Sequence, residues 1–154
     1  AEDGEAPVFV SAAVEPRDVA LLQRMVEFYD RFAERNAGDQ ALRLEAARAR
    51  SRVGAIHARL GSEAWLFAAE TAWQEAIALL SHIDDRDVRR ELAAAHGGLA
   101  RVLQRREQPD LAAEHLRTAL GLLEPLSAAG DRGALLARAE GDFLLARNAE
   151  LRRM

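Results

Sequence analysis

The chain contains no cysteine and no lysine, and these two absences exclude several kinds of site. Without cysteine there are no disulfides, no thiolate metal ligands and no cysteine nucleophile. Without lysine there is no Schiff-base lysine and no lysine of a phosphate-binding P-loop. All 21 basic residues are arginine, and the 33 alanines beside them indicate the coding bias of a GC-rich genome. Some of the arginines therefore reflect composition rather than function.

Long apolar runs and a strong net charge are absent as well. No run approaches the roughly 18 apolar residues of a membrane helix, so we expect no direct membrane insertion. The net charge of −4 gives no overall attraction to nucleic acid, and we expect no such partner. Residues 1–16 are acidic and lack the apolar centre of a signal peptide.

Residues 1–16 have no helical period and are interrupted by Pro7 and Pro16. We therefore predict an extended N-terminal arm over 1–16 and one helical domain over 17–154. The apolar residues 8–10 of the arm are candidates for docking on that domain. No later segment has the alternating pattern of a strand.

From residue 17 onward, apolar residues recur at steps of three and four, which predicts an all-α domain of about six helices. The expected helices span 17–36, 40–60, 63–81, 85–106, 109 to about 126, and 132–152. Glycine-then-cap pairs at 38–39, 61–62 and 130–131 separate three of them, and Asp85 is a candidate cap for a fourth. We expect Pro125 to kink the fifth helix or stop it early. Such short links predict that consecutive helices are antiparallel neighbours.

Small and bulky residues recur along these helices with a repeating spacing. Ala69, Trp73 and Ala76 have the same spacing as Ala112, Leu116 and Ala119, 43 residues later. Gly54, Ala100 and Gly141 are small residues of the even helices, 41 to 46 residues apart. A glycine in mid-helix costs about 1 kcal/mol relative to alanine. We therefore predict that these nine positions are close-packing residues where helices approach each other.

This pattern resembles the tetratricopeptide repeat, most clearly in HGGLARVLQRREQPDLAAEHLRTAL (96–120) and in RVGAIHARLG (52–61). The resemblance covers roughly residues 20–150. It implies antiparallel helical hairpins stacked as a short right-handed solenoid. Two features depart from the family: Glu107 stands where glycine is usual, and the spacing exceeds the usual 34 residues.

The segment LLQRMVEFYDRFAERNAGDQALRLEAARARSRVGAIHARLG (21–61) also resembles repeat regions of planctomycete-type bacterial signalling proteins, many of them serine/threonine kinases. In those proteins the repeats lie outside the catalytic domain. The present chain has no glycine-rich loop, catalytic lysine, HRD or DFG triplet. The resemblance is compatible with two cellular locations, namely the cytoplasm and the extracytoplasmic side of a membrane-anchored signalling protein.

No pattern of polar residues points to catalysis. The four histidines include no His-Glu-x-x-His pair, and no serine lies in a Gly-x-Ser-x-Gly setting. We expect no catalytic residue, no metal and no cofactor. An enzyme with its site between helices is the least favoured alternative. A cavity where His57 or His96 meets carboxylates would indicate one.

Arginines supply the one candidate binding surface. In a tetratricopeptide-like solenoid the first helix of each hairpin lines the concave groove, which places there Arg48, Arg52, Arg59, Arg101, Gln104, Arg105 and Arg138. Guanidinium groups bind carboxylates through paired hydrogen bonds, so an acidic peptide or a C-terminal carboxylate would suit this groove. The family's carboxylate-clamp asparagines are replaced by Ala55 and Arg101, so the corresponding chaperone-tail function is not expected.

The sequence therefore predicts a non-catalytic interaction module that binds a peptide or protein segment in an arginine-lined groove. The alternative is a regulatory or sensory domain of a larger bacterial signalling protein, acting through self-association or a small ligand. Hydrophobic residues in the groove, or unpaired apolar faces on the first and last helices, would favour self-association into a homo-oligomer.

Overall fold

The computed structural model describes residues 16–36 and 38–154, and this part of the chain is all-helical. Its helices are α1 (Pro16–Arg35), α2 (Gln40–Leu60), α3 (Glu63–Leu80), α4 (Arg86–Arg105), α5 (Pro109–Ala128) and α6 (Arg132–Leu151). The all-α prediction is confirmed, and most helix ends agree to within a residue. The predicted arm is one residue too long at its end, because Pro16 is the first residue of α1. The predicted docking of residues 8–10 lies outside the described residues.

The caps that the sequence offered are formed. Side chains of the four cap residues accept backbone N–H groups of the first helical turn: Asp39 from Leu42, Ser62 from Trp65, Asp85 from Asp87 and Val88, and Asp131 from Ala134. Gly61 and Gly130 have φ of 74° and 85°, the left-handed region that glycine enters without steric cost. These links turn the chain within a few residues and keep consecutive helices adjacent.

Pro125 does not stop α5 early, because the helix continues to Ala128. A proline removes one N–H group and crowds the carbonyl group four residues earlier, which belongs here to the exposed Gly121. Because Gly121 is exposed, water can replace the lost hydrogen bond. The N–H of Ala129 then donates to the carbonyl oxygen of Pro125 at 3.2 Å, which completes the last turn.

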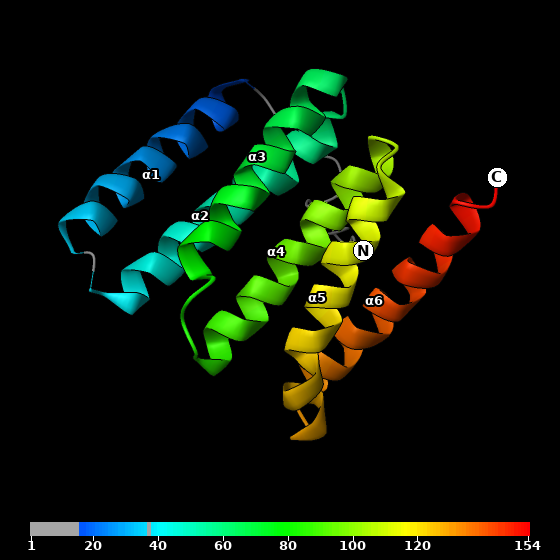
Figure 1. Cartoon of the computed structure of the whole chain (residues 1–154). Helices are drawn as coiled ribbons and strands as arrows, with labels where there is room; N and C mark the ends of the chain where they lie inside the picture. The colour runs from blue at the N-terminus through cyan, green and yellow to red at the C-terminus, as the bar shows by residue number, and fades with distance from the viewer. Residues whose placement is uncertain (1–15, 37) are drawn as a thin grey trace, which may run out of the picture.

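Consecutive helices pack against each other, and α4 also contacts both α2 and α6. The even helices α2, α4 and α6 therefore form one layer. Among the described residues, α1, α3 and α5 make no such contacts with one another and cover the other side of that layer. The result is a stack of antiparallel hairpins with α1 at one end and α6 at the other (Figure 1). None of these helices is long and apolar enough to cross a membrane, within the part of the chain described.

Small residues form much of the core. Ala69, Ala76, Ala100 and Ala112 are fully buried, and Leu116 and Ala119 are nearly so. Ala100 packs in one cluster with Ala112 and Leu116, which joins α4 to α5. Because alanine presents only a methyl group, two helices can lie close together along such contacts.

The half-buried ring of Trp73 on α3 lies between two glycines of the even layer. A Cβ atom on Gly54 of α2 would lie 2.8 Å from Nε1 of Trp73, and one on Gly98 of α4 would lie 2.6 Å from Cε2. At the next junction, a Cβ atom on Gly141 of α6 would lie 2.9 Å from Cδ2 of Leu120. Each of these glycines lets a bulky side chain of an odd helix reach the backbone of an even one.

Candidate binding groove

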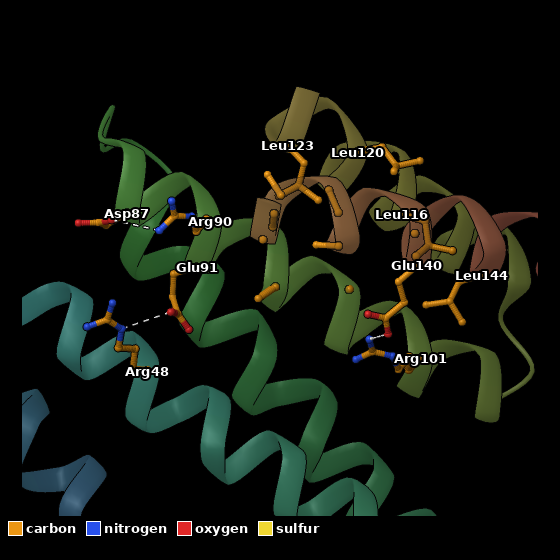
Figure 2. Close-up of a pocket in the computed structure, with 18 residues that line it drawn as sticks. Arg48, Asp87, Arg90, Glu91, Arg101, Leu116, Leu120, Leu123, Glu140 and Leu144 are labelled. Atoms are coloured by element: carbon orange, nitrogen blue, oxygen red, sulfur yellow. Dashed lines mark hydrogen bonds and ion pairs between the residues drawn. The ribbon is translucent and has the colours of Figure 1, made fainter. Parts of the chain in front are cut away.

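A cavity of about 400 Å³ opens between α4, α5 and α6. Figure 2 shows its leucines, contributed mostly by α5, and the charged side chains at its rim. Ligand pockets in proteins commonly have volumes of roughly 300–1,000 Å³. This cavity is therefore large enough to receive one or two bulky side chains of a partner.

The cavity exists because small residues face one another across it. Its walls contain Ala93, Ala94 and Gly97 on α4 and Ala134, Ala137 and Gly141 on α6. A Cβ atom on Gly97 would meet nothing within 4 Å, unlike one on the neighbouring Gly98. The apolar floor consists of Leu116, Leu120, Leu123 and Leu144. An apolar side chain entering from the open side would find an apolar surface beneath it.

Charges of both signs surround the opening. Nε of Arg48 donates to Glu91 at 3.2 Å, and Nη1 of Arg48 donates to Glu45 at 2.7 Å. These two carboxylates, Glu45 first, raise the pKa of Arg48. Arg101 of α4 pairs with Glu140 of α6 across the opening (Figure 2). The rim is thus a ring of ion pairs rather than a row of unpaired arginines.

Arg90 completes the rim and connects α4 to the start of α6. Its guanidinium group donates to the carboxylate of Asp131, from Nε at 3.1 Å, and lies 3.6 Å from Asp87. The Asp131 carboxylate also accepts the backbone N–H of Ala134 and a hydrogen bond from Arg86. These contacts, Arg90 first, lower the pKa of Asp131 to about 2. This corner of the groove is therefore fixed by charge as well as by packing.

The structure places two of the predicted partner-binding residues at the cavity, namely Arg48 and Arg101. Arg52 and Arg59 share a helix face with Arg48, are exposed, and form no ion pair with any described residue. Arg105 donates to the carbonyl oxygen of Ala58 at 2.6 Å. That carbonyl belongs to the last turn of α2, where a cation stabilises the helix end. Arg105 therefore has a structural contact of its own.

Gln104 and Arg138, the other two predicted binding residues, also make contacts within the chain. Gln104 donates to Oδ1 of Asn148 at 3.2 Å, and Asn148 in turn donates to the carbonyl oxygen of Pro109 at 2.8 Å. Arg138 donates to Oγ of Ser127 at 3.1 Å. That these residues bind a partner remains a prediction.

Sequence reasoning missed the carboxylates at the rim, chiefly Glu91 and Glu140, and the role of Gly97 and Gly98. The spacing of the glycines in the sequence could have indicated their role. Gly98 lies 44 residues after Gly54 and 43 before Gly141, a more even spacing than Ala100 gives. Two adjacent glycines in mid-helix also cost about 2 kcal/mol relative to alanine, which calls for a structural reason.

Two of the four histidines form a pair that the sequence did not suggest. Nδ1 of His96 on α4 lies 2.8 Å from Nδ1 of His115 on α5, and the rings are stacked. Burial, and secondarily the neighbouring His115, lower the pKa of His96 to about 4. Burial also lowers the pKa of His115, although Glu114 and Glu70 oppose this. The pair is therefore uncharged at neutral pH, with one ring donating to the other.

His57 stands apart from that pair. Its ring lies 4.9 Å from the ring of Trp65, and burial lowers its pKa. Neither His57 nor His96 lines the cavity. Among the described residues no group of three or more histidines and carboxylates is arranged to hold a metal ion.

Comparisons of the sequence with protein-family models and with curated proteins, and of the structure with solved structures, found no match.

Proposed function

We propose that the chain is a non-catalytic interaction module that binds a peptide segment in the groove between α4, α5 and α6. The observation that carries this proposal is the apolar cavity of about 400 Å³ beneath a ring of exposed charges. Such a site suits a segment with one bulky apolar side chain flanked by carboxylates. The tetratricopeptide-like repeat pattern supports the proposal, because solenoids of that kind use their concave layer for binding.

The ion pairs at the rim do not prevent a partner carboxylate from binding. The side chains of Arg101 and Glu140 are 50% and 57% exposed. An exposed ion pair contributes only about 0.2–1 kcal/mol, so a ligand carboxylate can replace Glu140 at little cost. Arg101 would then bind the ligand, and Arg48 would act similarly beside Glu91. The floor supplies most of the affinity and the arginines supply the preference for acidic segments.

The test uses helix-forming acidic peptides with a central leucine or phenylalanine, titrated against the protein by fluorescence anisotropy. Gly97→Leu should abolish binding, because a Cβ atom there meets nothing within 4 Å and the rest of the side chain would extend into the cavity. Gly121→Leu is the matched control, because Gly121 also faces open space but lies outside the cavity. Equal binding by the two variants would reject the groove.

The charge preference is tested separately. Replacing both Arg48 and Arg101 by glutamine should weaken binding of acidic peptides more than binding of their glutamine counterparts. Arg117→Gln, on the exposed part of α5, is the control. If the double variant weakens both peptide series equally, the arginines do not select for acidic segments.

A further inference from the structure

The two end helices of the stack expose large apolar side chains on their outer faces. On α1, Leu21, Phe28 and Phe32 are 60%, 56% and 44% exposed. On α6, Leu136 and Phe143 are 75% and 64% exposed, and Leu135 is 48% exposed. Because α1 and α6 lie at opposite ends (Figure 1), these are two separate surfaces. Terminal units of stacked-hairpin proteins usually present a polar outer face, so both surfaces call for an explanation.

The outer face of α1 corresponds to the face that α3 turns towards α2. Leu22, Val26 and Tyr29 of α1 pack against α2, just as Ala69, Trp73 and Ala76, 47 residues later, belong to the packed face of α3. By the same offset, Met25 corresponds to Ala72, which packs against Ala49 and Val53 of α2. The stripe Leu21, Met25, Phe28 and Phe32 is therefore where an odd helix meets a preceding even helix.

The outer face of α6 corresponds to the face that α4 turns towards α5. Ala93 packs against Ala119 and Leu123 of α5, and Ala100 and Leu103 pack against Ala112 and Leu116. The positions 46 residues later on α6 are Ala139, Ala146 and Ala149, and all three are exposed. The offset is the one that relates the starts of the two helices, Arg86 and Arg132. The alanine face of α6 is therefore where an even helix meets a following odd helix. By the same offset Leu136 and Phe143 correspond to Arg90 and Gly97 at the cavity, so they lie at the edge of this face.

These two faces are complementary, and we propose that copies of this chain associate head to tail, with α1 of one copy packed on α6 of the next. The contact would continue the alternation of odd and even helices from one copy into the next. Charge does not oppose it: α1 carries four arginines and four acidic residues, and residues 132–151 carry three of each. A head-to-tail contact leaves one free face at each end and permits further addition.

The proposal concerns the ends of the stack and does not depend on peptide binding in the groove. A contact between single helices is at the small end of specific interfaces, so we expect association weaker than micromolar. It would be observed by sedimentation velocity over a series of protein concentrations. We expect the average mass of the unmodified chain to rise with concentration.

Two single-end variants test the geometry. Phe28→Glu blocks the α1 face and Ala146→Glu, at an exposed alanine, blocks the α6 face, and each variant alone should be monomeric. An equimolar mixture should form a 1:1 pair and nothing larger, because each variant keeps the face that the other lacks. Leu111→Glu, at an exposed leucine of α5 away from both ends, is the matched control and should associate like the unmodified chain.

Three outcomes would overturn the proposal. An unmodified chain that stays monomeric at every concentration would show that the faces do not bind each other. Association that persists in Phe28→Glu or Ala146→Glu would show a symmetric contact instead. A mixture that stays monomeric would reject the pairing of α1 with α6. Thermal melts verify that the variants fold, and Leu21→Glu and Ala139→Glu replace any that do not.

Discussion

The ring of Trp73 lies so close to Gly98 that a single added methyl group would come within 2.6 Å of its Cε2 atom. Gly97, the preceding residue, faces the open cavity, with nothing within 4 Å of the same built atom. Two adjacent glycines thus serve opposite purposes. One permits contact between helices α3 and α4, and the other leaves room between α4 and α6.

Substitutions of these two glycines should therefore have opposite effects on stability. Gly98→Ala forces the indole ring or the helix to move, and overpacking of this kind costs about 1–3 kcal/mol. Gly97→Ala gains helix propensity without a clash and should stabilise the protein by up to about 1 kcal/mol. Urea unfolding of both variants measures the difference. Equal free energies of unfolding would show that Trp73 does not press on Gly98.

Gly54, on the other side of the same ring, extends this prediction. A Cβ atom there would lie 2.8 Å from Nε1 of Trp73, so a leucine cannot fit without displacing the ring. We expect Gly54→Leu to lower the free energy of unfolding by at least as much as Gly98→Ala does. Trp73→Leu should restore part of that loss, because the smaller side chain makes room. An unchanged melting temperature for Gly54→Leu would refute the close contact.

Local patterns allowed the helices to be predicted, because apolar steps of three and four and the cap residues are encoded within a few residues of each other. The same patterns could not reveal Arg101–Glu140 or Arg48–Glu91, whose partners are separated by 39 and 43 residues. Which arginine meets which carboxylate depends on how the helices are aligned in space. The predicted unpaired basic groove therefore overlooked carboxylates that the packing of α2, α4 and α6 brings to it.

At Glu107, a departure from the expected repeat pattern coincides with an unusual backbone conformation. It occupies the position where the tetratricopeptide pattern usually has glycine, and its φ is 59°, the left-handed region. It is the one non-glycine residue with positive φ among those described. For residues with a Cβ atom this conformation costs roughly 1–2 kcal/mol.

Replacing Glu107 by glycine should therefore stabilise the protein, by up to about 1 kcal/mol after the greater freedom of the unfolded chain is included. Glu114→Gly, at an exposed position within α5, is the control and should destabilise by about 1 kcal/mol. Thermal unfolding of both variants would give shifts in opposite directions. A loss of stability in Glu107→Gly would show that the glutamate side chain makes a contribution larger than its backbone strain.

Asp131 should stabilise the fold at neutral pH, and this contribution should be lost in acid. Its pKa is lowered to about 2 by Arg90 and by the cap hydrogen bond from Ala134. A carboxyl group with a lowered pKa stabilises the fold above its ordinary pKa, and this contribution is lost as the pH falls towards 2. At pH 7 we expect melting temperatures in the order unmodified, Asp131→Asn, Asp131→Ala, because asparagine keeps the cap but loses the ion pairs.

Asp39 offers a matched control for this series. It caps α2 through the N–H of Leu42 and has no ion pair with a described residue. Asp39→Asn should therefore leave the melting temperature nearly unchanged, since asparagine and aspartate cap about equally well. If Asp39→Asn and Asp131→Asn lower it equally, the arginines add nothing to the cap at Asp131.

The His96–His115 pair should make the protein less stable as the pH falls from about 6.5 to about 4. The folded pKa of His96 is about 4, below its ordinary value, so the unfolded chain binds a proton that the folded chain does not. The stabilising contribution of the uncharged pair is therefore present above about pH 6.5 and is lost progressively as the pH falls towards 4. Urea unfolding between pH 7.5 and pH 4.5 measures this slope. His96→Leu should reduce the slope, whereas substitution of the exposed His82 by asparagine should not. If His96→Leu keeps the full slope, the buried pair is not the group that takes up the proton on unfolding.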